Sequence, residues 1–353
     1  MTQRSATHVD LTPGYRISRL IKGGWQLAGG HGTISGAQAI RDMADFANAG
    51  ITTFDCADIY SGVEERIGEF LRSWRTSHHS AGEQVRVHTK FVPDLDALAD
   101  LTAHDIRRTI ERSRERLGVR AIDLVQLHWW DYHVPGVVDA ARYLSTLRDE
   151  GRIRQIGVTN FDTEHLAQLL DAGVPVISHQ VQYSLLDRRA AGAMATLCES
   201  HGIGLLAFGA VAGGFISEKW LDADEPSEPL ENRSLTKYKL IIDEFGGWGL
   251  FQELLHLLDT IARRHAVKIG TVAIRWVLDQ PAVAAVIVGA RHAGHLGDTR
   301  RALELQLTDD DRRAIDRLLA RSTGPDGEVY ALERDREGVH GRIMRYNLNA
   351  LSS

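Results

Sequence analysis

The 353-residue chain has a formal net charge of −6 and a pI near 6.2, which disfavours a generally basic surface for nucleic acid or anionic lipid. No segment approaches the ~20 apolar residues that cross a bilayer, and the opening residues lack an apolar run of signal-peptide length. We therefore expect a cytoplasmic protein whose partner is a small molecule. Cys56 and Cys198 are too few for a disulfide framework, and the sixteen histidines lack regular ligand spacing, so no metal site is predicted.

In chain order, the predicted elements begin with the segment 15–30, which reads as short strands with a glycine turn. Strands and helices then alternate. Strands are predicted at 52–57, 85–91, 121–129, 154–160, 176–183, 202–209 and 282–290. Helices are predicted at 37–49, 63–74, 104–117, 136–149, 163–172, 188–200, 250–264, 269–279 and 293–303, with an irregular stretch near 215–246. These elements make up eight βα units.

Such alternation fits either an open doubly wound sheet or a closed barrel. No GxGxxG fingerprint occurs, which weakens the classical dinucleotide-binding sheet. Chemistry-bearing residues follow many different strands, as they do at the C-terminal end of a (β/α)8 barrel. We predict one barrel domain over residues 15–321 and an extension, 322–353, that packs back on the barrel.

Four residues near the ends of three successive strands read as one proton-donating site: Asp55, Tyr60, Lys90 and His128. A phenol has a pKa near ~10, so a catalytic tyrosine needs a nearby cation that favours its phenolate. Lys90 would supply that cation, Asp55 would keep the lysine charged, and His128 would orient a carbonyl. Taken singly, each residue also fits a structural role, such as a helix cap or a buried core histidine. Their joint appearance at strand ends favours catalysis.

The order and spacing of these four residues resemble the aldo-keto reductase family. Tyr60 follows Asp55 by five positions, Lys90 by thirty-five and His128 by seventy-three. The resemblance extends from about Gly23 to Leu319 and matches the four residues to the family's catalytic tetrad. It implies a (β/α)8 TIM barrel whose bottom is closed by an N-terminal β-hairpin, here assigned to the segment 15–30.

The resemblance also implies a nicotinamide cofactor, NADP(H) by preference with NAD(H) as the alternative. Thr159 and Asn160 look like the pair that contacts the nicotinamide carboxamide, and Gln180 resembles a second amide partner. Phe208 stands where the family usually stacks a tyrosine on the nicotinamide, and phenylalanine keeps the stacking. Further cofactor contacts are assigned by position to Gly24, Trp25, Asp55, Gly209, Ala210 and Gly213. The glycines would let backbone approach a pyrophosphate, or would simply mark an irregular loop.

The segment that would hold the adenosine end departs from the family pattern. Gly289, Ala290 and Arg291 form a turn before a helix whose N-terminus can receive phosphate. His295 stands where many members have a second basic residue, and Asp298 and Thr299 replace the usual Glu-Asn pair. Arg291 is therefore the candidate for pairing a 2'-phosphate, with a solvated surface charge as the alternative.

Aromatic side chains are the candidates for the substrate pocket. Trp25, Trp129 and Trp130 would wall the mouth beside Tyr60 and His128, although some of these aromatics must be ordinary packing, which leaves Trp25 and Trp130 as the preferred candidates. The expected reaction is NAD(P)H-dependent reduction of an aldehyde or ketone. Three alternatives stay open: a sugar dehydrogenase running oxidatively, a cofactor-sensing binding module on the same fold, and a Schiff-base aldolase using Lys90.

Overall fold

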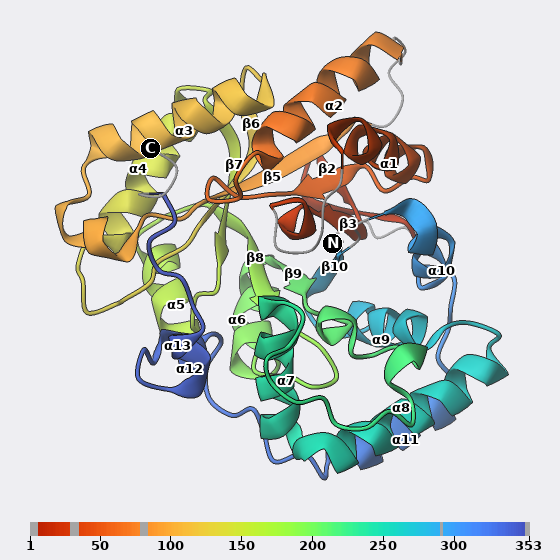
Figure 1. The fold of residues 1–353 in the computed structure, drawn as a ribbon. Helices are drawn as coiled ribbons and strands as arrows, with labels where there is room; N and C mark the ends of the chain where they lie inside the picture. The colour runs from red at the N-terminus through yellow and green to blue at the C-terminus, as the bar shows by residue number, and fades with distance from the viewer. Residues whose placement is uncertain (1–5, 29–34, 78–83, 290–291, 350–353) are drawn as a thin grey trace.

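The computed structural model describes residues 6–28, 35–77, 84–289 and 292–349, and the predicted barrel is confirmed (Figure 1). Eight parallel strands close in the order β10-β3-β4-β5-β6-β7-β8-β9. Their bounds are β3 Leu20–Gly23, β4 Thr53–Asp55, β5 Arg86–Phe91, β6 Ile122–Leu127, β7 Ile153–Thr159, β8 Val176–Gln182, β9 Gly204–Phe208 and β10 Val283–Gly289. The strands are almost wholly buried, as expected for a parallel sheet covered by helices on its outer face.

Helices surround the barrel and follow its strands (Figure 1). Their bounds are α1 Gly36–Asn48, α2 Val63–Ser77, α3 Ala103–Leu117, α4 Val137–Asp149, α5 Thr163–Asp171, α6 Ala193–His201, α7 Arg233–Phe245, α8 Gly247–Arg264, α9 Ile269–Leu278, α10 Leu296–Arg301, α11 Asp309–Leu319, α12 Ala331–Arg334 and α13 Val339–Arg342. No helix among the described residues is long and apolar enough to cross a membrane.

Local sequence explains where these helices begin and end, as α3 illustrates. The Thr102 hydroxyl accepts a hydrogen bond from the Asp105 backbone N–H, and the Asp105 carboxylate accepts one from the Thr102 backbone N–H. The helix ends at Gly118, whose φ of 63° is left-handed. Ile106 and Ile110 lie one turn apart and are buried in the core.

The hairpin exists, but it begins before the segment assigned to it. It consists of β1 (His8–Thr12) and β2 (Tyr15–Ser18), whereas β3, predicted as part of the hairpin, is a barrel strand. The Leu11 side chain packs closely against Gly204 at the start of β9. A Cβ on this glycine would stand only 2.5 Å from Leu11 Cδ2. Tyr15 stacks on His88 of β5 at 6.1 Å. The hairpin therefore covers the N-terminal end of the barrel, away from the strand ends that carry the candidate chemistry.

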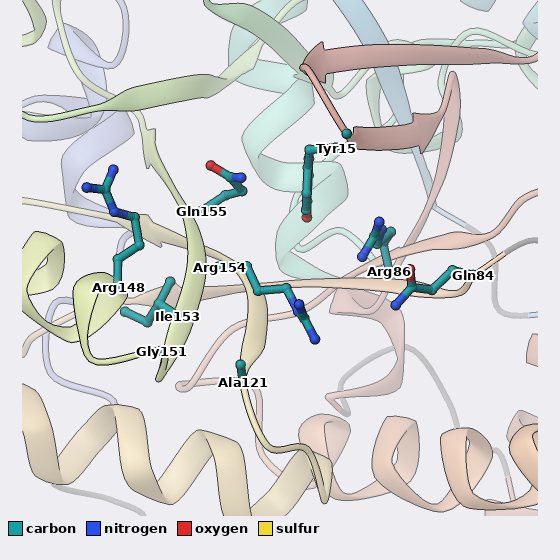
Figure 2. A pocket seen from close by; sticks show the side chains of 10 residues that line it. Tyr15, Gln84, Arg86, Ala121, Arg148, Gly151, Ile153, Arg154 and Gln155 are labelled. Atoms are coloured by element: carbon teal, nitrogen blue, oxygen red, sulfur yellow. The ribbon is translucent and has the colours of Figure 1, made fainter.

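A shallow cavity of about 460 Å³ lies between this hairpin and the starts of β5 and β7 (Figure 2). Arg86, Arg148 and Arg154 border it. Asp123 neutralises part of this charge, since its carboxylate lies 3.1 Å from Arg86 Nη1 and 3.5 Å from Arg154 Nε. Burial, as the largest influence, raises the pKa of Asp123, while both arginines oppose that rise. The ion pairs of Asp123 with Arg86 and Arg154 therefore stabilise the N-terminal end of the barrel.

Two helices differ from their predictions for physical reasons. The predicted helix at 188–200 begins only at Ala193, because Gly192 has a left-handed φ of 67°. The stretch near 215–246, predicted to be irregular, contains α7. Asn232 caps α7 by accepting a hydrogen bond from Leu235 N, and buried residues at helical spacing, including Ile241 and Phe245, hold the helix on the core.

The C-terminal tail crosses the end of the barrel where the strands finish. Arg334 Nη2 donates to the backbone oxygens of Asn160 at 2.7 Å and Trp129 at 3.0 Å, just beyond β7 and β6. Farther on, Asn349 Nδ2 donates to Val92 O beyond β5 at 2.8 Å. Figure 1 shows the blue tail running past α12 and α13 toward α3 and α4. The tail thus joins three successive βα loops.

Candidate active site

A cavity of about 990 Å³ opens at the C-terminal end of the barrel. The four residues predicted to form one catalytic site all line it. Strand register explains this meeting, because Asp55 lies beside His88 in the β4–β5 pair, and Lys90 beside Gln126 in the β5–β6 pair. The four predicted catalytic residues are far apart in the sequence but line the same cavity.

Lys90 is buried and firmly held. Its Nζ donates to Asp55 Oδ2 at 2.7 Å and to the Cys56 backbone oxygen at 2.9 Å. Burial alone would lower the pKa of Lys90, but the Asp55 carboxylate and its hydrogen bond, with a contribution from Tyr60, outweigh burial and raise the pKa above its usual range. Lys90 is therefore a permanent cation at neutral pH.

Tyr60 lies against this cation, with Lys90 Nζ 5.2 Å from its ring centroid. Burial raises the pKa of Tyr60 above the usual phenol value, while the Lys90 charge and a hydrogen bond to Lys90 lower it. Asp55 adds to the rise, because its negative charge partly cancels the lysine's influence on the phenol. Lys90 thus lowers the pKa of Tyr60, as expected, but burial outweighs it and the pKa is raised overall. The phenol therefore keeps its proton and can act as a proton donor.

His128 presents one unsatisfied nitrogen to the site. Its Nδ1 lies 3.3 Å from Thr159 O, whereas Nε2 is buried without a hydrogen-bond partner among the described residues. Burial, followed by the Arg334 charge, lowers the pKa of His128 to about 3, so the ring is neutral at pH 7. A neutral ring with its proton on Nδ1 donates to Thr159 O and leaves Nε2 as an acceptor. The other tautomer makes Nε2 a donor and forfeits that bond.

The residues assigned to the nicotinamide line the same cavity. Asn160 has a left-handed φ of 61°, and its buried Oδ1 has no partner among the described residues. Gln180 Nε2 donates to Asp55 Oδ1 at 2.7 Å and to Gln126 Oε1 at 3.1 Å, which leaves Gln180 Oε1 as an acceptor. Two amide oxygens and the Phe208 ring in the lining of one cavity suit a carboxamide N–H₂ on a flat ring. These residues fit the cofactor.

Gly209 and Gly213 border the cavity, but the neighbouring Tyr238 side chain leaves no room for a Cβ at either position. A Cβ at Gly209 would stand 2.5 Å from Tyr238 Oη, and one at Gly213 would stand 2.7 Å from Tyr238 Cδ2. Both glycines also have left-handed φ values, 79° and 65°. The packing of α7, which carries Tyr238, therefore explains these glycines without a pyrophosphate, although Ala210 beside them also lines the cavity.

Only part of the segment predicted to hold the adenosine end of the cofactor lies among the described residues. Gly289, His295, Asp298 and Thr299 line the cavity, as the sequence reading requires. Ala290 and Arg291 lie outside the described residues. At the neighbouring turn, Gly24 approaches strand β4 closely: its N–H donates to Asp55 O at 2.7 Å, and an added Cβ would stand 2.8 Å from that oxygen. Gly24 thus seats the loop that carries Trp25.

The three tryptophans assigned to the substrate separate into two groups. Trp25 and Trp130 line the cavity. Trp130 stands edge-on to His128, with ring centroids 4.2 Å apart, and Trp25 packs against Tyr60 at 5.1 Å. Trp129 does not line the cavity: it is 1% exposed, and its Nε1 donates to Val134 O at 3.2 Å. We therefore leave Trp129 out of the proposed substrate site.

Four residues in or beside the site were not predicted from the sequence. Gln126 does not line the cavity, but its Nε2 donates to Asp55 Oδ1 at 3.0 Å. It lies in β6 two residues before His128, which directly follows that strand, so the alternation of side chains along a strand could have indicated it. Lys237 lies on the missed helix α7. Tyr330 and Arg345 come from the tail. No local pattern indicated that these last three residues reach the site.

Comparison with known proteins agrees with this geometry. A model of the Aldo/keto reductase family matches residues 19–320. Flagellar radial spoke protein 5 of Chlamydomonas reinhardtii is 29% identical over 301 residues, covering 69% of this chain and only 56% of that longer protein. The NADH-specific methylglyoxal reductase of Escherichia coli is 25% identical over 322 residues, covering 84% of this chain and 92% of that enzyme.

Among solved structures, the glycerol dehydrogenase AKR11B4 from Gluconobacter oxydans shares the fold with a TM-score of 0.75 and 24% identity, over 92% of this chain and 98% of that chain. The family match spans the barrel strands from β3 to β10 and includes all four tetrad positions. The chain belongs to the aldo/keto reductase family.

Proposed function

We propose that this protein reduces an aldehyde or ketone to an alcohol with NAD(P)H, using Tyr60 as the general acid. The observation that carries the proposal is the buried Lys90 cation, held between Asp55 and Cys56 O against the Tyr60 ring, in a cavity that His128 also lines. A phenol, a cation and an imidazole in one cavity suit a carbonyl oxygen that gains negative charge.

The bound coenzyme would supply a hydride to the carbonyl carbon. Tyr60 would give its proton to the carbonyl oxygen, and Lys90 would stabilise the phenolate that remains. The Asp55 carboxylate keeps Lys90 protonated, while Gln126 and Gln180 hold that carboxylate in place. In its Nε2–H form, His128 would donate to the same oxygen and orient it.

The state of Lys90 counts against a Schiff-base aldolase. An amine attacks a carbonyl only when it is unprotonated, and such lysines usually have lowered pKa values. Here the pKa of Lys90 is raised. Borohydride treatment with substrate present should therefore leave Lys90 unlabelled, as judged by peptide mass analysis.

The proposed function is tested by following nicotinamide absorbance over a panel of aldehydes, ketones and free sugars with both coenzymes. We expect turnover of at least some aldehydes with NADPH. If both coenzymes bind but no compound in the panel is turned over, the cofactor-sensing module becomes the better interpretation.

His128 supports a second candidate, oxidation of an alcohol or sugar. The 3.3 Å contact between Nδ1 and Thr159 O favours the tautomer in which Nε2 accepts, and an acceptor suits an alcohol O–H better than a carbonyl oxygen. Comparing kcat/KM for matched alcohol–carbonyl pairs near neutral pH distinguishes the two directions. A consistently larger value for the alcohol would favour the oxidative function.

Coenzyme choice should follow the charge at the adenosine end. We expect a preference for NADPH that is modest, because Arg291 is the one strongly basic candidate in the turn. Loss of a charge-assisted contact costs ~1.5 to 3 kcal/mol, so Arg291→Ala should weaken NADPH binding roughly ten- to a hundredfold and leave NADH nearly unaffected. Quenching of tryptophan fluorescence measures both affinities, and equal losses would exclude Arg291 as the reader of the 2'-phosphate.

Substituting Trp130 should affect substrate binding, whereas substituting its neighbour Trp129 should affect stability. Trp130→Ala should raise KM for bulky carbonyls more than for small ones, because only a large substrate loses contact with the indole. Trp129→Ala should instead lower stability by ~3 to 5 kcal/mol, as expected for a buried tryptophan, without changing size selectivity. Kinetics with a size series and thermal unfolding of both variants check this, and equal KM changes for Trp130→Ala would favour a packing role.

A further inference from the structure

Lys237 is a cation in the wall of the active-site cavity that the proposed reaction does not use. It lies on α7, with Nζ 5.2 Å from the Phe208 ring centroid and 5.7 Å from that of Tyr330. The Tyr330 ring in turn stands edge-on to His128, with centroids 5.6 Å apart. The ammonium therefore lies one aromatic ring away from His128 and directly against the ring expected to face the nicotinamide.

The partners of Lys237 leave its charge poorly satisfied. Its nearest carboxylate oxygen is Glu333 Oε1 at 3.6 Å, beyond ordinary hydrogen-bond length. Glu333 is fully buried and already accepts from Arg189 at 3.0 and 3.2 Å, so its charge is shared. Burial, as the largest influence, lowers the pKa of Lys237, while the Glu333 carboxylate opposes that fall.

Two more cations from other elements line the same cavity, Arg233 at the start of α7 and Arg345 in the tail. Neither has a carboxylate within ion-pair distance among the described residues, and burial together with Arg345 lowers the pKa of Arg233. Asp55, by contrast, is occupied by Lys90. The cavity therefore presents three cations between α7 and the tail: Lys237 pairs with Glu333 at 3.6 Å, and Arg233 donates to the backbone oxygen of Ile343.

A structural role accounts for only part of the position of Lys237. Its charge helps to lower the pKa of Glu333, but Arg189 already gives that carboxylate two hydrogen bonds, and Lys237 also lines the cavity. A buried charge is costly without close partners, and a lysine that faces a cavity can obtain one from a ligand. We propose that Lys237 binds a carboxylate on the substrate, so that the preferred substrates are carbonyl compounds that also carry a carboxylate. This inference rests on the proposed carbonyl reduction.

The test compares benzaldehyde with its ortho, meta and para carboxylated forms, which place the carboxylate at three distances from the carbonyl. In the unsubstituted enzyme with NADPH, we expect kcat/KM for the best carboxylated isomer to exceed that for benzaldehyde by about tenfold or more. Lys237→Met should reduce this ratio roughly ten- to a hundredfold, and Lys237→Arg should retain more of it.

Lys239→Met is the matched control. It removes the same charge from the same helix, but Lys239 pairs with Glu225 and Asp243 and does not line the cavity. The ratio should not change in this variant. Thermal unfolding of all variants verifies folding, which should survive in Lys237→Met because Arg189 still pairs with Glu333.

The outcomes separate the two proposals. Turnover of benzaldehyde with a carboxylate ratio near one, or a ratio that Lys237→Met leaves unchanged, overturns the role of Lys237 and spares carbonyl reduction. Weaker NADPH binding in Lys237→Met with an unchanged ratio would instead make Lys237 a contact for coenzyme phosphate. If no aldehyde is turned over, fluorescence titration of the enzyme–NADP+ complex with benzyl alcohol and its carboxylated isomers applies the same criterion to binding.

Discussion

Tyr60→Phe is expected to lose nearly all carbonyl reduction while keeping its affinity for coenzyme. General acid catalysis is typically worth ~100-fold or more, and the substitution removes only the hydroxyl that donates the proton. The aromatic ring and its edge contact with Trp25 at 5.1 Å remain, so the cavity should keep its shape. Steady-state kcat with a small aldehyde and fluorescence titration with NADPH measure the two effects.

Tyr183→Phe provides the control for Tyr60→Phe. Tyr183 is buried just after β8 and lies outside the cavity lining, so losing its hydroxyl should leave kcat within about twofold, as for a change that touches no transition-state contact. If Tyr60→Phe retained more than about a tenth of the original kcat, Tyr60 would not be the acid.

Lys90→Met should have the next largest effect, on both rate and stability. Lys90 is the group that lowers the pKa of Tyr60 against burial, so its loss raises that pKa further. The phenolate then forms only at higher pH, and the pH profile of alcohol oxidation should move upward. Breaking a buried ion pair also costs about 3 to 5 kcal/mol, with the lower end expected because Gln126 and Gln180 still donate to Asp55.

A double variant separates these two consequences of losing Lys90. Combining Lys90→Met with Asp55→Asn removes both charges, so stability should partly return while the rate stays low. Chemical unfolding and pH–rate profiles of the single and double variants provide the comparison. An unchanged pH profile with a near-normal rate would reduce Lys90 to a structural ion pair.

The sequence predicted the barrel, and it predicted that the four tetrad residues lie together, because both depend on local patterns. Alternating strand and helix signals identify the architecture, and each tetrad residue lies at or just beyond a strand end, where parallel strands bring side chains together. The same logic accounts for Gln126, which lies in β6 two residues before His128 and pairs with Lys90 in the β5–β6 ladder. The order of the strands in the barrel therefore determines which of these side chains lie close together.

The cavity walls were less predictable because they depend on contacts between distant segments. Charged and turn-forming residues before Asn232 concealed α7, whose capping and apolar spacing become clear only once its boundaries are known. Tyr330 and Arg345 follow the last barrel helix, and nothing near them in sequence indicates which loop they cover. The direction of the Tyr60 pKa shift also required burial, which a sequence does not supply.

The path of the tail across the barrel end places part of the cavity wall outside the segment that matches the family. The family match stops at residue 320, whereas Tyr330 and Arg345 complete the cavity and Glu333 anchors Arg189. A chain shortened to the matched segment would retain every tetrad residue, yet it would lose the cavity wall that the tail supplies and leave the buried Arg189 with a single carboxylate. We therefore expect that exchanging this tail for that of another aldo/keto reductase would change the cavity wall while leaving the four tetrad residues in place.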